Sequence, residues 1–387
     1  MAVAGIVAEY NPFHLGHAYH LAQTRAALGR DGAVVCVMSG HWVQRGECAA
    51  ADKWTRSALA LAGGADLVLE LPTPWAMASA EAFARGAVGL LEATGVVDIL
   101  SFGSEDGSLE ALRQAADALD SPGYPARLRE ALGHGLSFPA ARQTAADCPC
   151  LSSPNNNLGV EYLRALRALG SAMTPMTVAR RGAGHDSTGH MEGFASASHI
   201  RALLREGRRE EAAALLPDGS LEALGQPASL LWAERAILAR LRTMEEAHWA
   251  ALPDGGGAEG LPARLVRAAR QACSLEEFYT LAKTRRYTHA RLRRLALAGY
   301  LGLRGDLPQL PPYLRLLGGS EAGLAGIPGR AAGVGIPVSQ SLAKLSRMPG
   351  DAGRVASLEA RAGALWSLCL RRPRAASEEF TEKFIRV

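Results

Sequence analysis

The feature that most constrains the fold of this chain is a short apolar run that leads through a proline turn into a helix. Residues 3–8 read VAGIVA, the pattern of a strand covered on both faces in a parallel sheet. Pro12 excludes a helix through Asn11, and from Leu15 onward apolar residues recur at helical spacing. The sequence therefore predicts a buried strand, a tight turn and a helix that begins near His14.

Two histidines stand at the start of this predicted helix. His14 and His17 are three residues apart and share one face of its first turn. There the unpaired backbone N–H groups and the helix dipole favour an anion, and two imidazoles can donate hydrogen bonds to phosphate oxygens. Gly16, which lacks a Cβ, lets a ligand approach the backbone. The alternative is a helix-capping histidine beside a surface one.

Strands and helices then alternate at intervals of about 30 residues, which predicts an α/β, Rossmann-like parallel sheet with right-handed crossovers. Further strands are expected at residues 33–38, 66–71 and 96–102, and an edge strand at 173–178. Ligands bind beyond the carboxyl ends of such strands. His14 and His17, residues 39–47 and residues 103–105 are thus expected to converge on one crevice. Residues 152–159 are expected to form a turn, followed by a helix over 160–169.

Beyond about residue 210 the strand signal disappears. We expect an α/β domain that carries the crevice over residues 1–210 and a mainly α-helical domain over 211–387, with few clear elements between 304 and 350. Basic residues cluster at 283–294, where Tyr287 is available for stacking. This cluster is either a solvated helix face or a contact with RNA phosphates.

Composition excludes several classes of protein. The chain has 387 residues and a formal net charge of only +4, which by itself proves no nucleic-acid binding. The spacing of its six cysteines matches neither a zinc site nor a secreted disulfide framework, so we expect free thiols and no metal site built from protein ligands. No uncharged apolar run reaches ~18 residues, and the start lacks a basic leader, so we expect a cytoplasmic protein.

Several blocks along the chain together resemble one known family. The opening GIVAEYNPFHxGHxYH is followed in order by MSGxxVQRGE, DKWTR, FGSE, SPNNxLGxEY and KTRRYT, between residue 5 and about residue 288. This arrangement resembles the bacterial tRNA(Met) cytidine acetate ligases, which are similar in fold to nucleotidyltransferases. The resemblance implies that ATP and acetate form acetyl-adenylate, whose acetyl group passes to N4 of the wobble cytidine of elongator tRNA(Met).

The resemblance also implies that residues 1–210 form the nucleotidyltransferase-like ATP-binding catalytic domain and residues 211–387 the tRNA-binding domain, and it implies roles for individual residues. His14 and His17 would act on the phosphates, with magnesium held through ATP oxygens. The ATP-binding residues would be Val7, Ala8, Glu9, Tyr10, Asn11, Pro12, Phe13, Leu15, Gly16, Ala18, Tyr19, His20, Gly103, Asn155, Asn156, Arg180, Ser198 and Arg201. The tRNA-binding residues would be Lys283, Arg285, Arg286 and Arg291.

Three positions depart from the family pattern, and two other functions stay open. His41 and Trp42 replace a small polar residue followed by Phe, so Trp42 is expected to narrow the carboxylate pocket; Asn157 replaces an aliphatic residue. A small-molecule nucleotidyltransferase would use the same crevice. A nucleotide-regulated RNA-binding protein without turnover would use the basic cluster.

Overall fold

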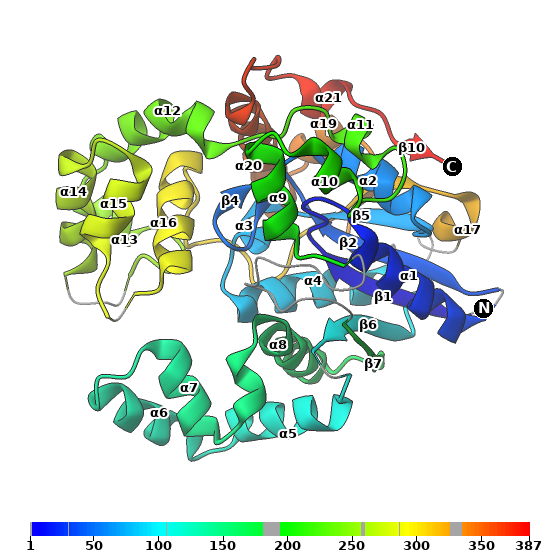
Figure 1. Cartoon of the computed structure of the whole chain (residues 1–387), viewed down its shortest axis with the longest axis horizontal. Coiled ribbons are helices and arrows are strands. Elements are labelled where there is room, and N and C mark those ends of the chain that lie inside the picture. Colours follow the sequence, from blue (N-terminus) through cyan, green and yellow to red (C-terminus); the bar gives the residue numbers. More distant parts are fainter. Residues whose placement is uncertain are drawn as a thin grey trace.

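One twisted sheet forms the centre of the molecule (Figure 1). The computed structural model describes residues 2–29, 31–105, 107–180, 194–256, 260–285, 287–325 and 335–387. Within them the strand order is β10–β8–β5–β2–β1–β6–β7, with β9 beside β8. The strands are β1 (Val3–Ala8), β2 (Ala33–Ser39), β5 (Leu67–Leu71), β6 (Ile99–Ser104), β7 (Thr174–Ala179), β8 (Leu314–Gly319), β9 (Val338–Ser339) and β10 (Ile385–Arg386).

The predicted parallel sheet is confirmed. β1 pairs in parallel with β2 and β6, β2 pairs with β5, and β7 lies at one edge, where Pro175 costs no interior hydrogen bond. Alternate side chains enter two cores. Ile6, Val34 and Val68 pack under α1 (Leu15–Leu28) and α2 (Lys53–Ala62). Val3, Val35 and Leu69 face the opposite layer, which includes α4 (Ala80–Thr94), α8 (Pro154–Leu169) and α20 (Gly350–Trp366).

Helix boundaries follow the capping residues. α1 begins directly after His14, as expected, and Asp52 caps α2 by accepting a hydrogen bond from the Thr55 N–H (2.7 Å). α8 begins six residues earlier than the expected helix. Ser153 caps it and Pro154 occupies its first position, which proline suits because that N–H has no intrahelical partner. The expectation of a turn at residues 155–157 is therefore wrong: the asparagines lie in the first turn of α8.

The expected division of the chain at residue 210 differs from the structure. β8 joins the sheet antiparallel to β5, and β10 pairs with β8, so residues 314–386 contribute to the same sheet as the first 180 residues. Elements also exist between residues 304 and 350, namely β8, β9, α17 (Glu321–Leu324) and α19 (Leu342–Ser346). Strand β8 was not predicted because residues 314–319 (LRLLGG) include an arginine and two glycines, which are unusual in a buried strand.

A bundle of helices lies beside the sheet (Figure 1). It consists of α12 (Leu230–Arg242), α13 (Glu246–Ala250), α14 (Leu261–Gln271), α15 (Leu275–Ala282) and α16 (His289–Leu301), which enclose a second core together with Trp42 and part of α20. We call these residues, 230–301, the helical bundle.

A short hairpin joins the bundle to the sheet. It is formed by β3 (Trp42–Val43) and β4 (Glu47–Cys48). At its turn Gly46 has a φ of +72°, and a Cβ there would lie 2.6 Å from the backbone nitrogen of Arg294 in α16. Only glycine allows this approach between two backbones.

Five ionisable side chains are buried together beside the sheet, namely Lys53, Glu70, Arg315, Glu359 and Glu379. The Lys53 ammonium lies 2.6 Å from Glu379 of α21 (Glu378–Thr381) and also contacts Glu70 of β5. Arg315 of β8 bridges Glu70 (2.9 Å) and Glu379 (2.5 Å). Burial, assisted by the charge of Glu70, raises the pKa of Glu359 to about 8, so this carboxyl is mainly protonated at neutral pH. Two cations then balance two anions.

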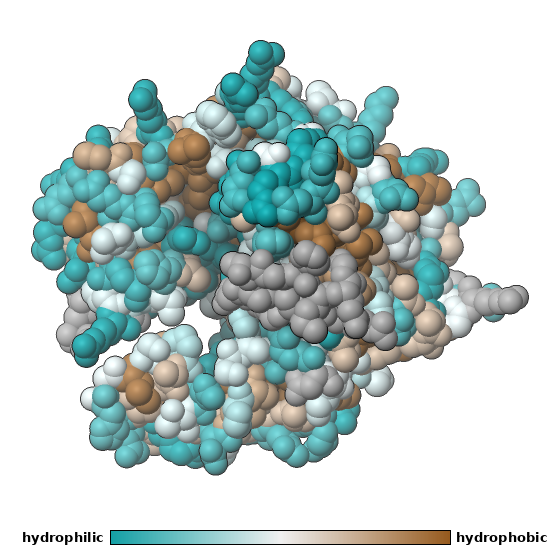
Figure 2. Space-filling model, in the orientation of Figure 1, coloured by the Kyte–Doolittle hydropathy of each residue, from teal (hydrophilic) through white to brown (hydrophobic). Residues whose placement is uncertain are grey.

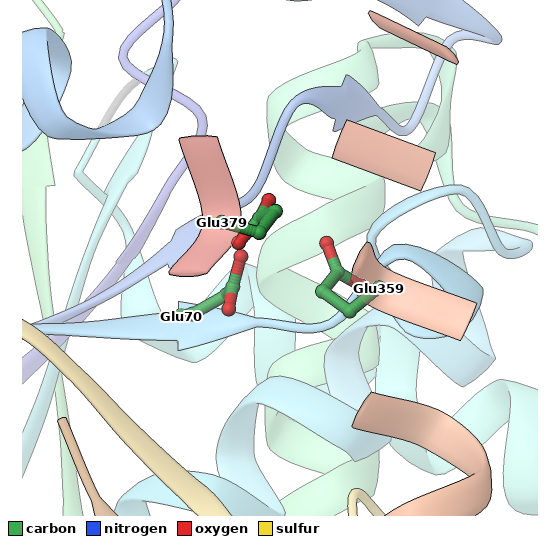
Figure 3. A group of neighbouring side chains, drawn as sticks. All are labelled: Glu70, Glu359 and Glu379. Carbon is green, nitrogen blue, oxygen red and sulfur yellow. The ribbon is translucent and has the colours of Figure 1, made fainter. Parts of the chain in front are cut away.

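Glu70, Glu359 and Glu379 are close enough to suggest a metal site (Figure 3), because their ligand oxygens lie within 4.8 Å of one another. Lys53 already contacts Glu70 and Glu379 and supplies the positive charge that a metal ion would bring. We therefore interpret the group as a structural ion network. The six cysteine side chains, all among the described residues, form no disulfide in this structure. No helix in the described ranges is both long and apolar enough to cross a membrane.

This network generates a prediction about stability. Glu70→Gln should lower the free energy of unfolding by about 3–5 kcal/mol, because it leaves Lys53 and Arg315 with a single charged carboxylate. The surface pair Arg354–Asp306 is the matched control, since Arg354→Gln should change stability by less than about 1 kcal/mol. Urea unfolding of both variants checks this. Equal losses would show that the buried ions contribute no more than surface ones.

Candidate active site

A cavity of about 400 Å³ opens at the carboxyl ends of β1, β6 and β7. Parallel strands place their following loops at this edge, so the crevice lies where the sequence predicted it. The predicted site residues that line it are Val7, Ala8, Glu9, Tyr10, Asn11, His14, Gly16, His17, Tyr19, His20, Gly103, Asn155, Arg180, Ser198 and Arg201.

The two histidine rings stack on each other at the start of α1, and each accepts a hydrogen bond from the backbone there. His14 Nδ1 accepts the Gly16 N–H (3.0 Å), and His17 Nδ1 accepts the His14 N–H (3.3 Å). The rings stack with centroids 3.7 Å apart. Because Nδ1 of each neutral ring is an acceptor, its proton must reside on Nε2. His14 therefore caps the helix, as the alternative reading expected, but His17 lines the cavity and is not a surface residue, and both rings carry an N–H donor.

Burial keeps these rings neutral. It lowers the pKa of His14 to about 3, and the charges of Arg180 and Arg201 act in the same direction. Burial also lowers the pKa of His17 well below its usual value, with His14 and Arg180 adding to the effect. The pKa of His20 falls to about 4 through burial and Arg180. The histidines of this cavity are therefore uncharged hydrogen-bonding groups at neutral pH.

The backbone at the start of α1 differs from the expectation of unpaired N–H groups. The Leu15 N–H donates to the Leu215 carbonyl (3.1 Å), and the N–H groups of residues 16, 17 and 18 all bond to His14. A Cβ on Gly16 would lie 2.9 Å from the His14 ring, so this glycine makes room for the ring. The helix dipole still favours negative charge here, while the side chains supply the donors.

Three arginines give the cavity its positive charge. Arg180 donates to the side-chain oxygen of Asn155 (3.3 Å), whose amide donates to Glu105 (2.6 Å). Arg201 donates to the Asn11 carbonyl (2.7 Å), and Arg45 is the third. Glu9 is the one carboxylate among the described lining residues. Three cations against one anion suit a polyphosphate ligand.

Arg201 also connects the cavity to the helical bundle. Its second amino group bonds Glu47 of the hairpin (3.1 Å), and the other Glu47 oxygen accepts from Arg293 of α16 (3.3 Å). Ser196 caps α9 (Ala197–Arg205) by accepting the His199 N–H, and its hydroxyl lies 2.9 Å from that of Ser198. The serine-rich start of α9 thus brings both Ser198 and Arg201 to the cavity wall.

Some predicted residues lie elsewhere. The ring of Phe13 is fully buried and packs closely on the backbone of Gly63. The side chain of Asn156 accepts a hydrogen bond from the Glu105 N–H. Neither these two residues nor Pro12, Leu15 and Ala18 line the cavity. Trp42 does not narrow the cavity: it is buried in the core of the helical bundle and donates to the Ala362 carbonyl (3.0 Å). Asn157, which also departs from the family pattern, is one of the residues that line the cavity.

Sequence reasoning expected the segment 39–47 at the crevice without naming its individual residues as ligand-binding, and it did not name the aromatic residues that α4, β6 and α8 contribute to the lining. Gln44 and Arg45 come from the hairpin, while Phe83, Phe102 and Tyr162 form an apolar wall. The VQRGE block marks the first two, and Phe102 and Tyr162 lie in the FGSE and SPNNxLGxEY blocks, whereas nothing in the sequence separates Phe83 from an ordinary core residue.

The basic cluster only partly matches its expected role. The Lys283 ammonium donates to the carbonyls of Thr284 and Tyr287 (2.7 Å each), which closes its own loop. Arg291 donates to the Asp254 carbonyl (2.6 Å) and lies over the Tyr287 ring. Arg285 is exposed, and Arg286 lies outside the described residues.

Comparisons with known proteins agree with this geometry. The family model described as "HIGH Nucleotidyl Transferase" matches residues 1–380. The tRNA(Met) cytidine acetate ligase of Syntrophotalea carbinolica is 42% identical over 84% of this chain and 81% of its own length. That of Acetivibrio thermocellus is 36% identical over the whole of both chains.

Solved structures extend the likeness to the fold. TmcAL of Thermotoga maritima bound with alpha-thio ATP superposes with a TM-score of 0.88 at 32% identity, and its apo form with 0.90 at 34%. Each covers 100% of both chains. The matched family, the sequence identity and the shared fold lead to one conclusion: this chain belongs to the tRNA(Met) cytidine acetate ligase family of HIGH nucleotidyl transferases.

Proposed function

We propose that this chain activates acetate with ATP and transfers the acetyl group to N4 of the wobble cytidine of elongator tRNA(Met). An acetate oxygen attacks the α-phosphorus of ATP, pyrophosphate leaves, and acetyl-adenylate forms. The cytidine amino group then attacks the acetyl carbon and AMP leaves. The names of the relatives supply the two substrates. The observation that carries the proposal is the cavity, where two neutral histidines and three arginines surround a helix N-terminus.

These groups suit displacement at phosphorus. The reaction spreads negative charge over the phosphate oxygens, so positioning and charge stabilisation supply most of the catalysis. Neutral Nε2–H groups on His14 and His17 donate hydrogen bonds without a proton being lost or gained. Arg180 and Arg201 oppose the developing charge from the other walls of the cavity.

Magnesium enters this scheme with ATP. A magnesium ion keeps several waters and binds phosphate oxygens with few protein ligands. The described lining residues provide a single carboxylate, Glu9, and no group of carboxylates that would form a cage. Magnesium would therefore be held mainly by ATP rather than by the protein, and it would supply positive charge to the phosphates.

The helical bundle is the proposed tRNA-binding part. Of the four residues expected to bind tRNA, Arg285 is the best placed among those described, because its side chain is exposed whereas the Lys283 ammonium is bonded within its own loop. Glu47 and Gly46 fix α16 against the hairpin that borders the cavity. A tRNA held by the bundle would thus be held at a constant position relative to the ATP.

The first test is acetate-dependent exchange of pyrophosphate into ATP. His17→Ala should lower exchange by about 100-fold or more, because a donor to the reacting phosphates is lost, while tRNA affinity stays nearly unchanged. Mass spectrometry of tRNA(Met) for N4-acetylcytidine follows the second step. Exchange without tRNA acetylation would favour a metabolite enzyme, and tRNA binding without exchange would favour a non-catalytic protein.

The second test concerns pH. His14 has a folded pKa of about 3 and an unfolded value near 6.5, so the unfolded state binds more protons between these values and stability falls as pH drops below about 6.5. Asparagine caps helices equally well but does not titrate. His14→Asn should therefore flatten the dependence between pH 6 and 4.5 by about 1.4 kcal/mol per pH unit. Urea unfolding at several pH values measures it; an unchanged slope contradicts the prediction.

The third test addresses the bundle. Arg285→Gln should weaken tRNA binding and reduce the slope of log affinity against log salt by about 1, as expected for one lost phosphate contact. Arg386→Gln is the control, because Arg386 is exposed on β10, far from α16 in Figure 1. Filter binding at several salt concentrations compares the variants. Identical slopes for Arg285→Gln and the unsubstituted protein would remove Arg285 from the interface.

A further inference from the structure

Glu9 has a position that the activation of acetate does not explain. It follows the last residue of β1 and lines the cavity. Its Oε1 accepts the backbone N–H of Gln44 (2.8 Å), which fixes the carboxylate. Within the described ranges, no group donates to Oε2. A half-buried carboxylate with one held oxygen and one free oxygen is a ready proton acceptor.

The other titratable groups nearby are weaker proton acceptors. His14 and His17 use Nδ1 to accept backbone hydrogen bonds, and His20 Nε2 lies 3.0 Å from the Ser101 hydroxyl. Burial lowers the pKa of all three rings, to about 3 for His14 and about 4 for His20. In contrast, burial raises the pKa of Glu9 above its usual value, although the Gln44 N–H opposes this.

Glu9 also lies on the correct side of the cavity for the acceptor. Gln44, which holds it, belongs to the hairpin whose Gly46 and Glu47 contact α16 of the helical bundle. Arg201, which contacts the same Glu47, is among the charges that act on Glu9. A nucleotide presented by the bundle would reach the cavity past this hairpin, next to Glu9.

We propose that Glu9 is the general base of the acetyl-transfer step, which rests on the proposed function above. The cytidine amino group is conjugated with its ring and is a poor nucleophile, so loss of a proton must accompany its attack. The bond from N4 to the acetyl carbon forms as the bond from that carbon to the AMP phosphate oxygen breaks. AMP leaves as an anion, and the proton moves from N4 to Oε2 of Glu9.

The test separates the two half-reactions in the full-length protein. Glu9→Gln keeps the hydrogen bond from Gln44 but cannot accept the proton. Because Glu9 lines the ATP cavity, acetate-dependent ATP–pyrophosphate exchange is measured in the same variant as the reference for the second step, together with acetohydroxamate formation when hydroxylamine, a strong nucleophile, replaces tRNA. Single-turnover formation of N4-acetylcytidine should fall by about 100-fold or more relative to both reference rates. Glu81→Gln, an exposed carboxylate outside the cavity lining, is the matched control and should change neither step.

A pH profile and a second variant complete the design. In the unsubstituted protein the acetyl-transfer rate should rise with pH and level off above the pKa of Glu9, whereas the residual rate of Glu9→Gln should lack this rise. Glu9→Asp, which retains a carboxylate, should keep the pH dependence at a reduced rate.

Two results would overturn the proposal. Either Glu9→Gln acetylates tRNA at the normal rate, or it loses exchange and hydroxamate formation together with transfer, which would place Glu9 in the first step or in folding. If Glu9→Gln does not fold, a pH-independent transfer rate in Glu9→Asp overturns it equally. Absence of exchange in the unsubstituted protein would instead refute the proposed function itself.

Discussion

The cavity depends on one junction, where β1 ends and α1 begins with a histidine as its cap. The cap uses Nδ1 of His14, and His17 uses the same atom to bond the His14 N–H. This arrangement fixes which nitrogen of each ring carries the proton, and burial prevents a second proton from binding. The same two hydrogen bonds therefore cap the helix and set the position of the proton on each ring. A substitution that removes one of these bonds would affect both the helix start and the site.

The elements that the sequence predicted correctly share a local signal. The strands at the centre of the sheet are continuous apolar runs, and α1 and α2 have recognisable caps in His14 and Asp52. Because parallel strands place their following loops at one edge, the location of the cavity followed from the order of the elements. The chemistry of the site was predictable wherever a residue directly follows a strand, as Glu9 and Arg180 do.

The elements that were missed depend on distant partners. Arg315 appears unsuited to a buried strand until Glu70 and Glu379, far from it in sequence, are placed beside it. Lys53 looks like a surface residue of α2 for the same reason. The aromatic wall of Phe83, Phe102 and Tyr162 comes from three separate elements. Local sequence patterns do not indicate contacts between residues far apart in the chain. The pairing of β8 with β5, and of β10 with β8, could therefore not be predicted.

The late strands have a consequence for how the protein forms during synthesis. β8 and β10 complete the sheet whose first strand is β1, and Glu379 lies against both Lys53 and Arg315. Until residues 314–386 have been translated, β5 lacks its partner β8, and Lys53 has Glu70 beside it but not Glu379. The residues that line the ATP cavity lie between Ile6 and Arg201, yet the sheet that supports them is completed only by residues 314–386.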